Sequence, residues 1–75
     1  MRTSTEILYA MPSRLHTAYD WVASAGEVDA LAAMTEEQAE LYADACEANA
    51  TQHDVPLRAL EVEALACWLR GAVRS

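Results

Sequence analysis

Two cysteines and two histidines are the residues of this sequence best suited to nucleophilic catalysis or metal binding. Zinc sites need such ligands in clusters, for example CxxC or HxxxH, and neither spacing occurs here. His16 with Asp20, and the adjacent His53 and Asp54, are typical of surface hydrogen bonds. Cys46 and His53 are the remaining nucleophile and base, and they would need a cleft and a third, orienting group. We therefore predict a non-enzymatic protein that uses no metal or cofactor.

Both cysteines fall on apolar faces of predicted helices. If the helices that carry Cys46 and Cys67 form an antiparallel hairpin, the two residues lie about 12 Å apart along the axis. A disulfide needs Cα atoms within roughly 7 Å. We predict two free, buried thiols, as expected in a reducing cytoplasm.

The acids of this sequence are concentrated in its middle, where nine of them lie between Arg14 and Arg58 with no lysine or arginine. Five fall within an arc of roughly 100° on one predicted helix. We call them the acidic stripe: Glu36, Glu37, Glu40, Asp44 and Glu47. Like charges four residues apart destabilise a helix by roughly 0.2–0.5 kcal/mol per pair, so the stripe is a candidate docking surface for a basic protein. Two structural alternatives are a solvated face that keeps the bundle soluble and a face neutralised by Arg58, Arg70 or Arg74.

Charge and composition exclude several functions for this chain of 75 residues. A net charge of −7 argues against direct binding of nucleic acid or of anionic membrane surfaces, and it permits a basic partner. No run approaches the ~20 apolar residues of a membrane span, and the first residues lack the pattern of a signal peptide. We expect one helical domain over residues 1–75, located in the cytoplasm.

Helix start signals divide the sequence. Three capping boxes, each pairing a Ser or Thr with an acid or amide three residues later, are Thr3 with Glu6, Ser24 with Glu27, and Thr35 with Gln38. The run Asp54-Val55-Pro56 is a fourth start signal. The fold class is therefore all-α, a small bundle of four to five short helices, at about 4–10, 13–23, 25–33, 36–49 and 56–73. Pro12 interrupts an apolar stripe that stays in phase, so the first helix is either kinked or split there, and we favour the split.

The last predicted helix is apolar nearly all round, which is typical of a buried helix. One face carries Leu57, Leu60, Ala64, Cys67 and Trp68, and a second carries Val62, Leu65, Leu69 and Val73. In so small a domain this helix is either the centre of the bundle or half of a dimer interface. Trp68 is predicted to anchor the core, whereas Trp21 lies at the edge of its apolar stripe and is the better candidate for a contact residue.

In size, acidity and helical content the chain resembles small phage-encoded inhibitors, including anti-CRISPR proteins and DNA mimics. The resemblance is one of class and transfers no individual residue. It implies a stoichiometric inhibitor or modulator that occludes a basic, nucleic-acid-binding surface of a larger protein. The predicted contact residues are the acidic stripe and Trp21. The alternative is a homodimeric structural or assembly protein that associates through Val62, Leu65, Leu69 and Val73.

Overall fold

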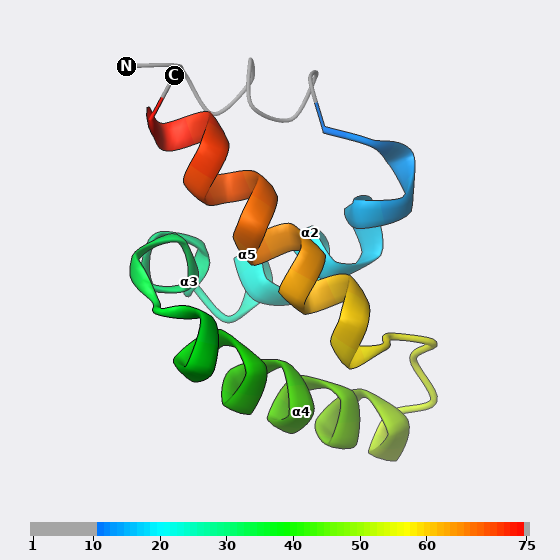
Figure 1. The fold of residues 1–75 in the computed structure, drawn as a ribbon. Coiled ribbons are helices and arrows are strands. Elements are labelled where there is room, and N and C mark those ends of the chain that lie inside the picture. The colour runs from blue at the N-terminus through cyan, green and yellow to red at the C-terminus, as the bar shows by residue number, and fades with distance from the viewer. Residues whose placement is uncertain (1–10, 75) are drawn as a thin grey trace.

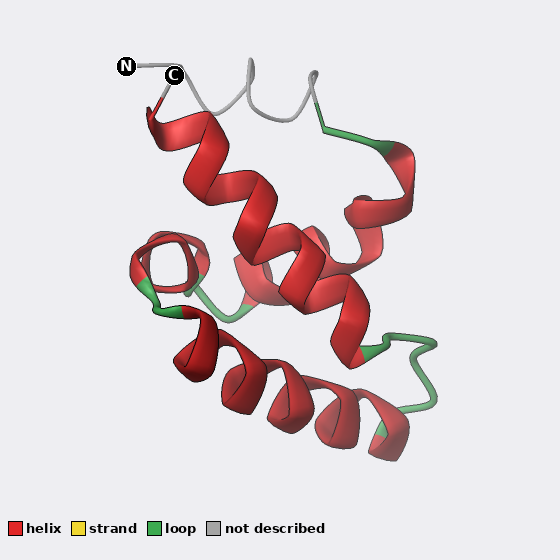
Figure 2. Cartoon of the chain, in the orientation of Figure 1, coloured by secondary structure: helices red, strands yellow, loops and turns green. Residues whose placement is uncertain are grey.

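Helices follow one another closely in the described part of the chain, which covers residues 11–74 of the computed structural model, with side chains described for 11–71 (Figure 1). They are η1 (Ser13–Leu15), α2 (His16–Ser24), α3 (Val28–Ala33), α4 (Glu36–Gln52) and α5 (Ala59–Arg74). No strand occurs in this range (Figure 2). The predicted all-α bundle is confirmed. The predicted helix 4–10 and the capping box of Thr3 with Glu6 lie outside the described residues.

Pro12 separates the described helices from the chain that precedes them. Its backbone is extended, with φ −58° and ψ 139°, so no helix runs through it. The Leu15 N–H donates to the Pro12 carbonyl at 3.0 Å and closes the turn of η1. η1 then continues directly into α2. A kinked helix that continues through Pro12 is therefore ruled out, and the proline precedes η1 without the loss of a backbone hydrogen bond. The first piece of the split that we favoured, 4–10, is not among the described residues.

The predicted capping box of Ser24 with Glu27 is wrong. Ser24 is the last residue of α2, and no side chain caps the first turn of α3. Gly26 ends α2 instead, with φ +71°. Its N–H donates to the Ala23 carbonyl at 3.0 Å, and the Glu27 N–H donates to the Val22 carbonyl at 3.1 Å. This pair of bonds is the Schellman ending of a helix, so Gly26 was the stronger signal.

The capping box of Thr35 with Gln38 is confirmed at the start of α4. The Gln38 N–H donates to the Thr35 hydroxyl oxygen at 3.2 Å, and the Thr35 N–H donates to the Gln38 side-chain oxygen at 3.1 Å. Two backbone donors at the helix end are thereby satisfied. The cap determines where α4 begins, and so it determines the position of the acidic stripe along the axis.

The last helix begins three residues later than we predicted from Asp54-Val55-Pro56. Asp54 has φ +56°, and the backbone stays non-helical until Ala59. Two carboxylates accept from the amide that precedes α5 and from its first amide. Glu61 accepts from the Arg58 N–H at 3.4 Å, and Glu47 of α4 accepts from the Ala59 N–H at 3.2 Å. The start of α5 therefore depends on a contact with another helix, which a local pattern does not reveal.

α5 is the central helix of the bundle. It packs against η1, α2, α3 and α4, which lie around it in Figure 1. Val62 and Leu65 are fully buried and Leu69 is 2% exposed. Of the two roles considered for this face, these three residues belong to the core of the single chain. The side chain of Val73 lies outside the described residues.

The predicted apolar face that begins with Leu57 points only in part toward the core. Leu57 is buried, and Ala64 and Trp68 pack against the core as half-buried residues. Leu60, in contrast, is 75% exposed, and Cys67 is exposed too. The assignment of these two residues to an apolar face is corrected, because α4 and the other helices leave one side of α5 uncovered.

A pair of leucine variants tests the central position of α5. We expect Leu65→Ala to lower the free energy of unfolding by about 2–5 kcal/mol, because the buried methyl groups leave a cavity. The matched change Leu60→Ala removes the same atoms from an exposed position, and we expect it to change stability by less than about 0.5 kcal/mol. Urea unfolding followed by circular dichroism measures both. Equal losses in the two variants would contradict the described packing.

Candidate functional site

A groove lined with carboxylates runs between α4 and α5. It consists of two adjoining hollows of about 460 and 390 Å³, which share three residues, Glu37, Glu40 and Glu63. The first hollow also reaches Ala39, Cys67 and Arg70, and the second also reaches Leu41. We call this the acidic groove and define it by its five acids: Glu36, Glu37, Glu40, Asp44 and Glu63.

The groove owes its position to the small residues on the inner face of α4. That face buries Ala39, Ala43, Cys46 and Ala50 at three- and four-residue spacing. Short side chains let α5 lie close to α4, and the acids occupy the adjoining flank of the same helix. A carboxylate is costly to bury without a partner, so the acids stay at the rim while the alanines form the contact.

Four of the five acids in the stripe line the acidic groove, and the fifth does not. Glu36, Glu37, Glu40 and Asp44 are all exposed. Glu47 instead accepts the hydrogen bond from Ala59 that caps α5. Its carboxylate therefore contributes to the fold, and the candidate contact set loses one member.

Glu63 joins the groove from the opposite wall, and the sequence analysis did not assign it to the site. In the sequence it belongs to the narrow polar remainder of the last helix, far from the acidic stripe. The packing of α5 against α4 brings it beside Glu37 and Glu40. An assumed helix hairpin was the only signal that could have found it.

Among the described side chains, no arginine forms an ion pair with an acid of the groove. Arg70 lines the hollow together with Glu36 and Glu37. Its Nε is buried without a hydrogen-bond partner. The side chain of Arg58 is exposed, and that of Arg74 lies outside the described residues. Within 11–71, the carboxylates thus remain open to an external cation.

Leu41 is an apolar residue among these carboxylates. It is 69% exposed and lines the same hollow as Glu37 and Asp44. A helical wheel of α4 places Leu41 well away from the alanine face, so its exposure was a signal available in the sequence. One apolar side chain is thus exposed within a rim of carboxylates.

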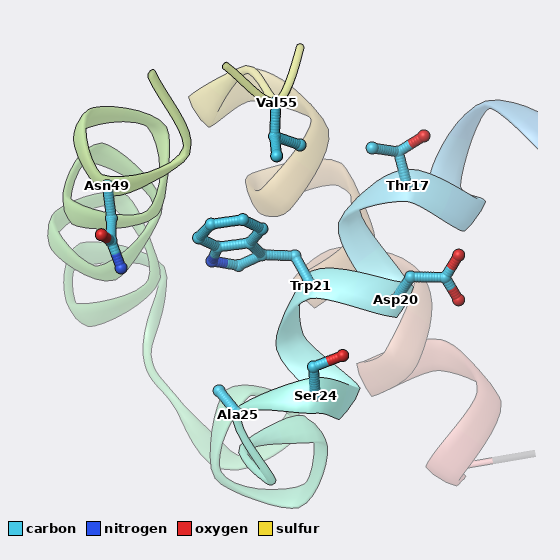
Figure 3. Close-up of a pocket in the computed structure, with 7 residues that line it drawn as sticks. All are labelled: Thr17, Asp20, Trp21, Ser24, Ala25, Asn49 and Val55. Atoms are coloured by element: carbon cyan, nitrogen blue, oxygen red, sulfur yellow. The ribbon is translucent and has the colours of Figure 1, made fainter. Parts of the chain in front are cut away.

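Trp21, the other predicted contact residue, lies on a different flank of α4. It projects from α2 toward Asn49, and Val55 points toward its indole from the connection between α4 and α5 (Figure 3). The ring centroids of Trp21 and His53 are 6.4 Å apart, with an interplanar angle of 49°. The predicted partner-binding residues therefore form two separate surfaces rather than one.

A half-buried cluster of side chains links α4 to the start of α3. Burial above all raises the pKa of the Tyr42 phenol, and its hydrogen bonding with Glu27 and Cys46 raises that pKa further. Burial also raises the pKa of the Cys46 thiol, and the charge of Glu27 adds to this, although the hydrogen bond with Tyr42 opposes it. Cys46 thus pairs with Tyr42, and the ring of His53 lies near Trp21 instead. The Cys46–His53 pair considered from the sequence does not form.

The described residues hold neither a cluster of metal ligands nor a helix that could cross a membrane. Within the described residues, no three His, Cys, Asp or Glu side chains are grouped so as to hold a metal ion. None of the helices described here combines the length and hydropathy that crossing a membrane requires.

No protein-family model, curated protein or solved structure matches this chain.

The two thiols are free, as predicted, but only Cys46 is buried, so the prediction for Cys67 is corrected. We expect a thiol reagent such as 5,5′-dithiobis(2-nitrobenzoate) to modify Cys67 rapidly. Cys46 reacts far more slowly, because it is enclosed and its raised pKa keeps it protonated. The absorbance change of the reagent, followed over short and long times, measures the fast reaction of Cys67 and the slow reaction of Cys46. The Cys67→Ser variant is the control, and a fast phase that persists in it would contradict the burial of Cys46.

The raised pKa of Tyr42 predicts a pH dependence of stability. The folded state holds this proton more tightly than the unfolded state, so the associated stability is complete below the usual value of 10.0 and is lost as the pH rises through the folded pKa. We expect the free energy of unfolding to fall above about pH 10, and to fall less steeply in Tyr42→Phe. Urea unfolding at a series of pH values measures the slopes. Identical slopes in the two proteins would contradict the raised pKa of Tyr42.

Proposed function

We propose that this chain is a non-enzymatic protein-binding module that uses the acidic groove to occlude a basic surface on a larger protein. The observation that carries the proposal is a set of five carboxylates, drawn from two helices, that surround two adjoining hollows and form no ion pair within the described residues. Such a set destabilises the folded chain through its own repulsion. Binding of a basic partner would remove that repulsion.

The arrangement of the groove suits a polypeptide rich in arginine or lysine. Glu36, Glu40 and Asp44 follow one another at steps of about 6 Å along α4, and Glu63 faces them from α5. Complementary charges of this kind speed association and select the partner. Leu41, exposed among them, offers the apolar contact that lengthens the lifetime of a complex.

A basic surface that normally holds nucleic acid is the target class that we favour. The resemblance in size, charge and helical content to small phage-encoded inhibitors, among them anti-CRISPR proteins, supports an inhibitor or modulator. The charge spacing of α4 is wider than that of duplex phosphates, which lie about 3.4 Å apart on each strand. The groove would therefore block such a surface by charge and shape, without copying the geometry of nucleic acid.

Homodimerisation through the last helix is the alternative, and we do not favour it. Val62, Leu65 and Leu69 are enclosed within the single chain, so they are not available as a dimer interface. A second copy would have to use the exposed Leu41 or Leu60, and it would bring like-charged grooves together. Light scattering over a dilution series measures the oligomeric state directly.

Charge reversal in the groove tests the proposed function. We expect Glu40→Lys together with Asp44→Lys to weaken binding of the native partner by roughly tenfold or more and to remove its sensitivity to salt. Both residues are exposed, so the fold should be retained. Affinity capture from a lysate of the native host identifies partners, and titration of each purified basic protein then gives its affinity.

A milder pair of variants separates the groove from the overall charge. Glu40→Gln with Asp44→Asn changes the net charge by the same amount as Asp29→Asn with Asp54→Asn, two exposed acids outside the groove. We expect only the first pair to reduce binding appreciably, and asparagine tolerates the backbone conformation of Asp54. Unchanged affinity after charge reversal, at both low and high salt, would eliminate the acidic groove from the mechanism.

A further inference from the structure

A second cavity lies beside Trp21, where α2, α4 and the connection that follows α4 meet. Its volume is about 490 Å³, and its lining consists of Thr17, Asp20, Trp21, Ser24, Ala25, Asn49 and Val55 (Figure 3). Trp21 and Val55 are half-buried and pack against the core, while the polar members of the lining are exposed. The cavity thus combines an aromatic wall with hydrogen-bonding groups around it.

The electrostatic surroundings of this cavity favour a cation. α2 ends at Ser24 and α4 ends at Gln52, and neither helix carries a basic residue in its last turn. The C-terminus of a helix bears a partial negative charge of about half an elementary charge. Asp20 adds a full carboxylate at the rim, where Figure 3 shows it projecting from α2 on the side away from Asn49. Two helix ends and one acid therefore act on the same small space. Among the described residues that line it none is basic, and the His53 ring lies 6.4 Å from the Trp21 ring.

We propose that this cavity binds the guanidinium group of an arginine side chain from a partner polypeptide. A guanidinium is planar and weakly hydrated, so it stacks on an indole face while its N–H groups remain free to donate. Asn49, Thr17 and Ser24 line the cavity, and each carries a side-chain oxygen that can accept from such donors. An ammonium group lacks the planar face, and a neutral planar group gains nothing from the negative surroundings.

A polypeptide is a better source of this group than free arginine. The free amino acid carries an α-carboxylate, which the helix ends and Asp20 would repel. In a peptide bond the same residue presents only its positive charge. The site therefore distinguishes the two sources by the charge that accompanies the guanidinium.

The cavity is separate from the acidic groove, so the inference does not rest on the proposed function. Asn49 and Glu40 are nine residues apart on α4, which is about two and a half turns and places them on opposite sides of the helix. Failure of the groove to bind a partner would leave the cavity untouched, and the reverse also holds.

Titration of the isotope-labelled full chain with N-acetyl-arginine amide tests the inference. We expect saturable shifts, at millimolar concentration, in the NMR signals of the Trp21 indole N–H and the Asn49 side-chain amide. The Trp21→Phe variant identifies the indole signal, since the chain holds two tryptophans. The matched citrulline and lysine amides, and free arginine, should each bind several-fold more weakly.

Variants then locate the effect. We expect Trp21→Leu to weaken binding roughly two- to fivefold, because it keeps apolar bulk but removes the π face. Asp20→Asn should weaken binding more than Asp44→Asn, which makes the same charge change in the acidic groove. Absence of shifts at Trp21 and Asn49, equal binding of the citrulline amide, or equal effects of Asp20→Asn and Asp44→Asn would each overturn the site. Equal binding of free arginine would overturn the assignment to a polypeptide.

Discussion

The contact between α4 and α5 determines most of what this protein presents to its surroundings. Ala39, Ala43 and Ala50 give α4 a smooth inner face, and α5 lies against it with Val62 and Leu65 fully buried. Close packing of short side chains leaves little room between the helices. The charged side chains of both helices therefore lie at the edge of the contact, where their carboxylates form the two walls of the acidic groove.

The same contact explains why one chain carries two distinct charged surfaces. α4 turns its alanine face toward the core, so its two flanks point in different directions. One flank forms the acidic groove with α5, and the other meets the end of α2 at the cavity beside Trp21. Glu47 lies at the end of the first flank, and there its carboxylate caps α5. In a domain this small, an acid that stabilises the fold lies close to acids that form no ion pair within the described residues.

The incorrect predictions share one cause. They follow local sequence patterns at positions where a turn or a contact with a distant residue determines the helix boundary or the exposure of a side chain. Ser24 and Glu27 have the spacing of a capping box, but the left-handed conformation available to Gly26 ended α2 first. Pro56 suggested the start of a helix, yet α5 begins at Ala59, where the Glu47 carboxylate meets its first amide. Leu60 and Cys67 are apolar by type, and their exposure depends on which side of α5 the other helices leave open.

The sequence by itself determined the all-helical class, the break at Pro12, the start of α4 at its Thr35 cap and the line of acids along that helix. These features depend on backbone preferences and on helical spacing, both of which act over a few residues. Only the tertiary structure decided that Glu63 faces the acids of α4 and that Glu47 turns away to cap α5. It also decided that Trp21 lines a separate cavity. Those relations join residues that are far apart in the chain, and they exist only once the alanine face of α4 has packed against α5.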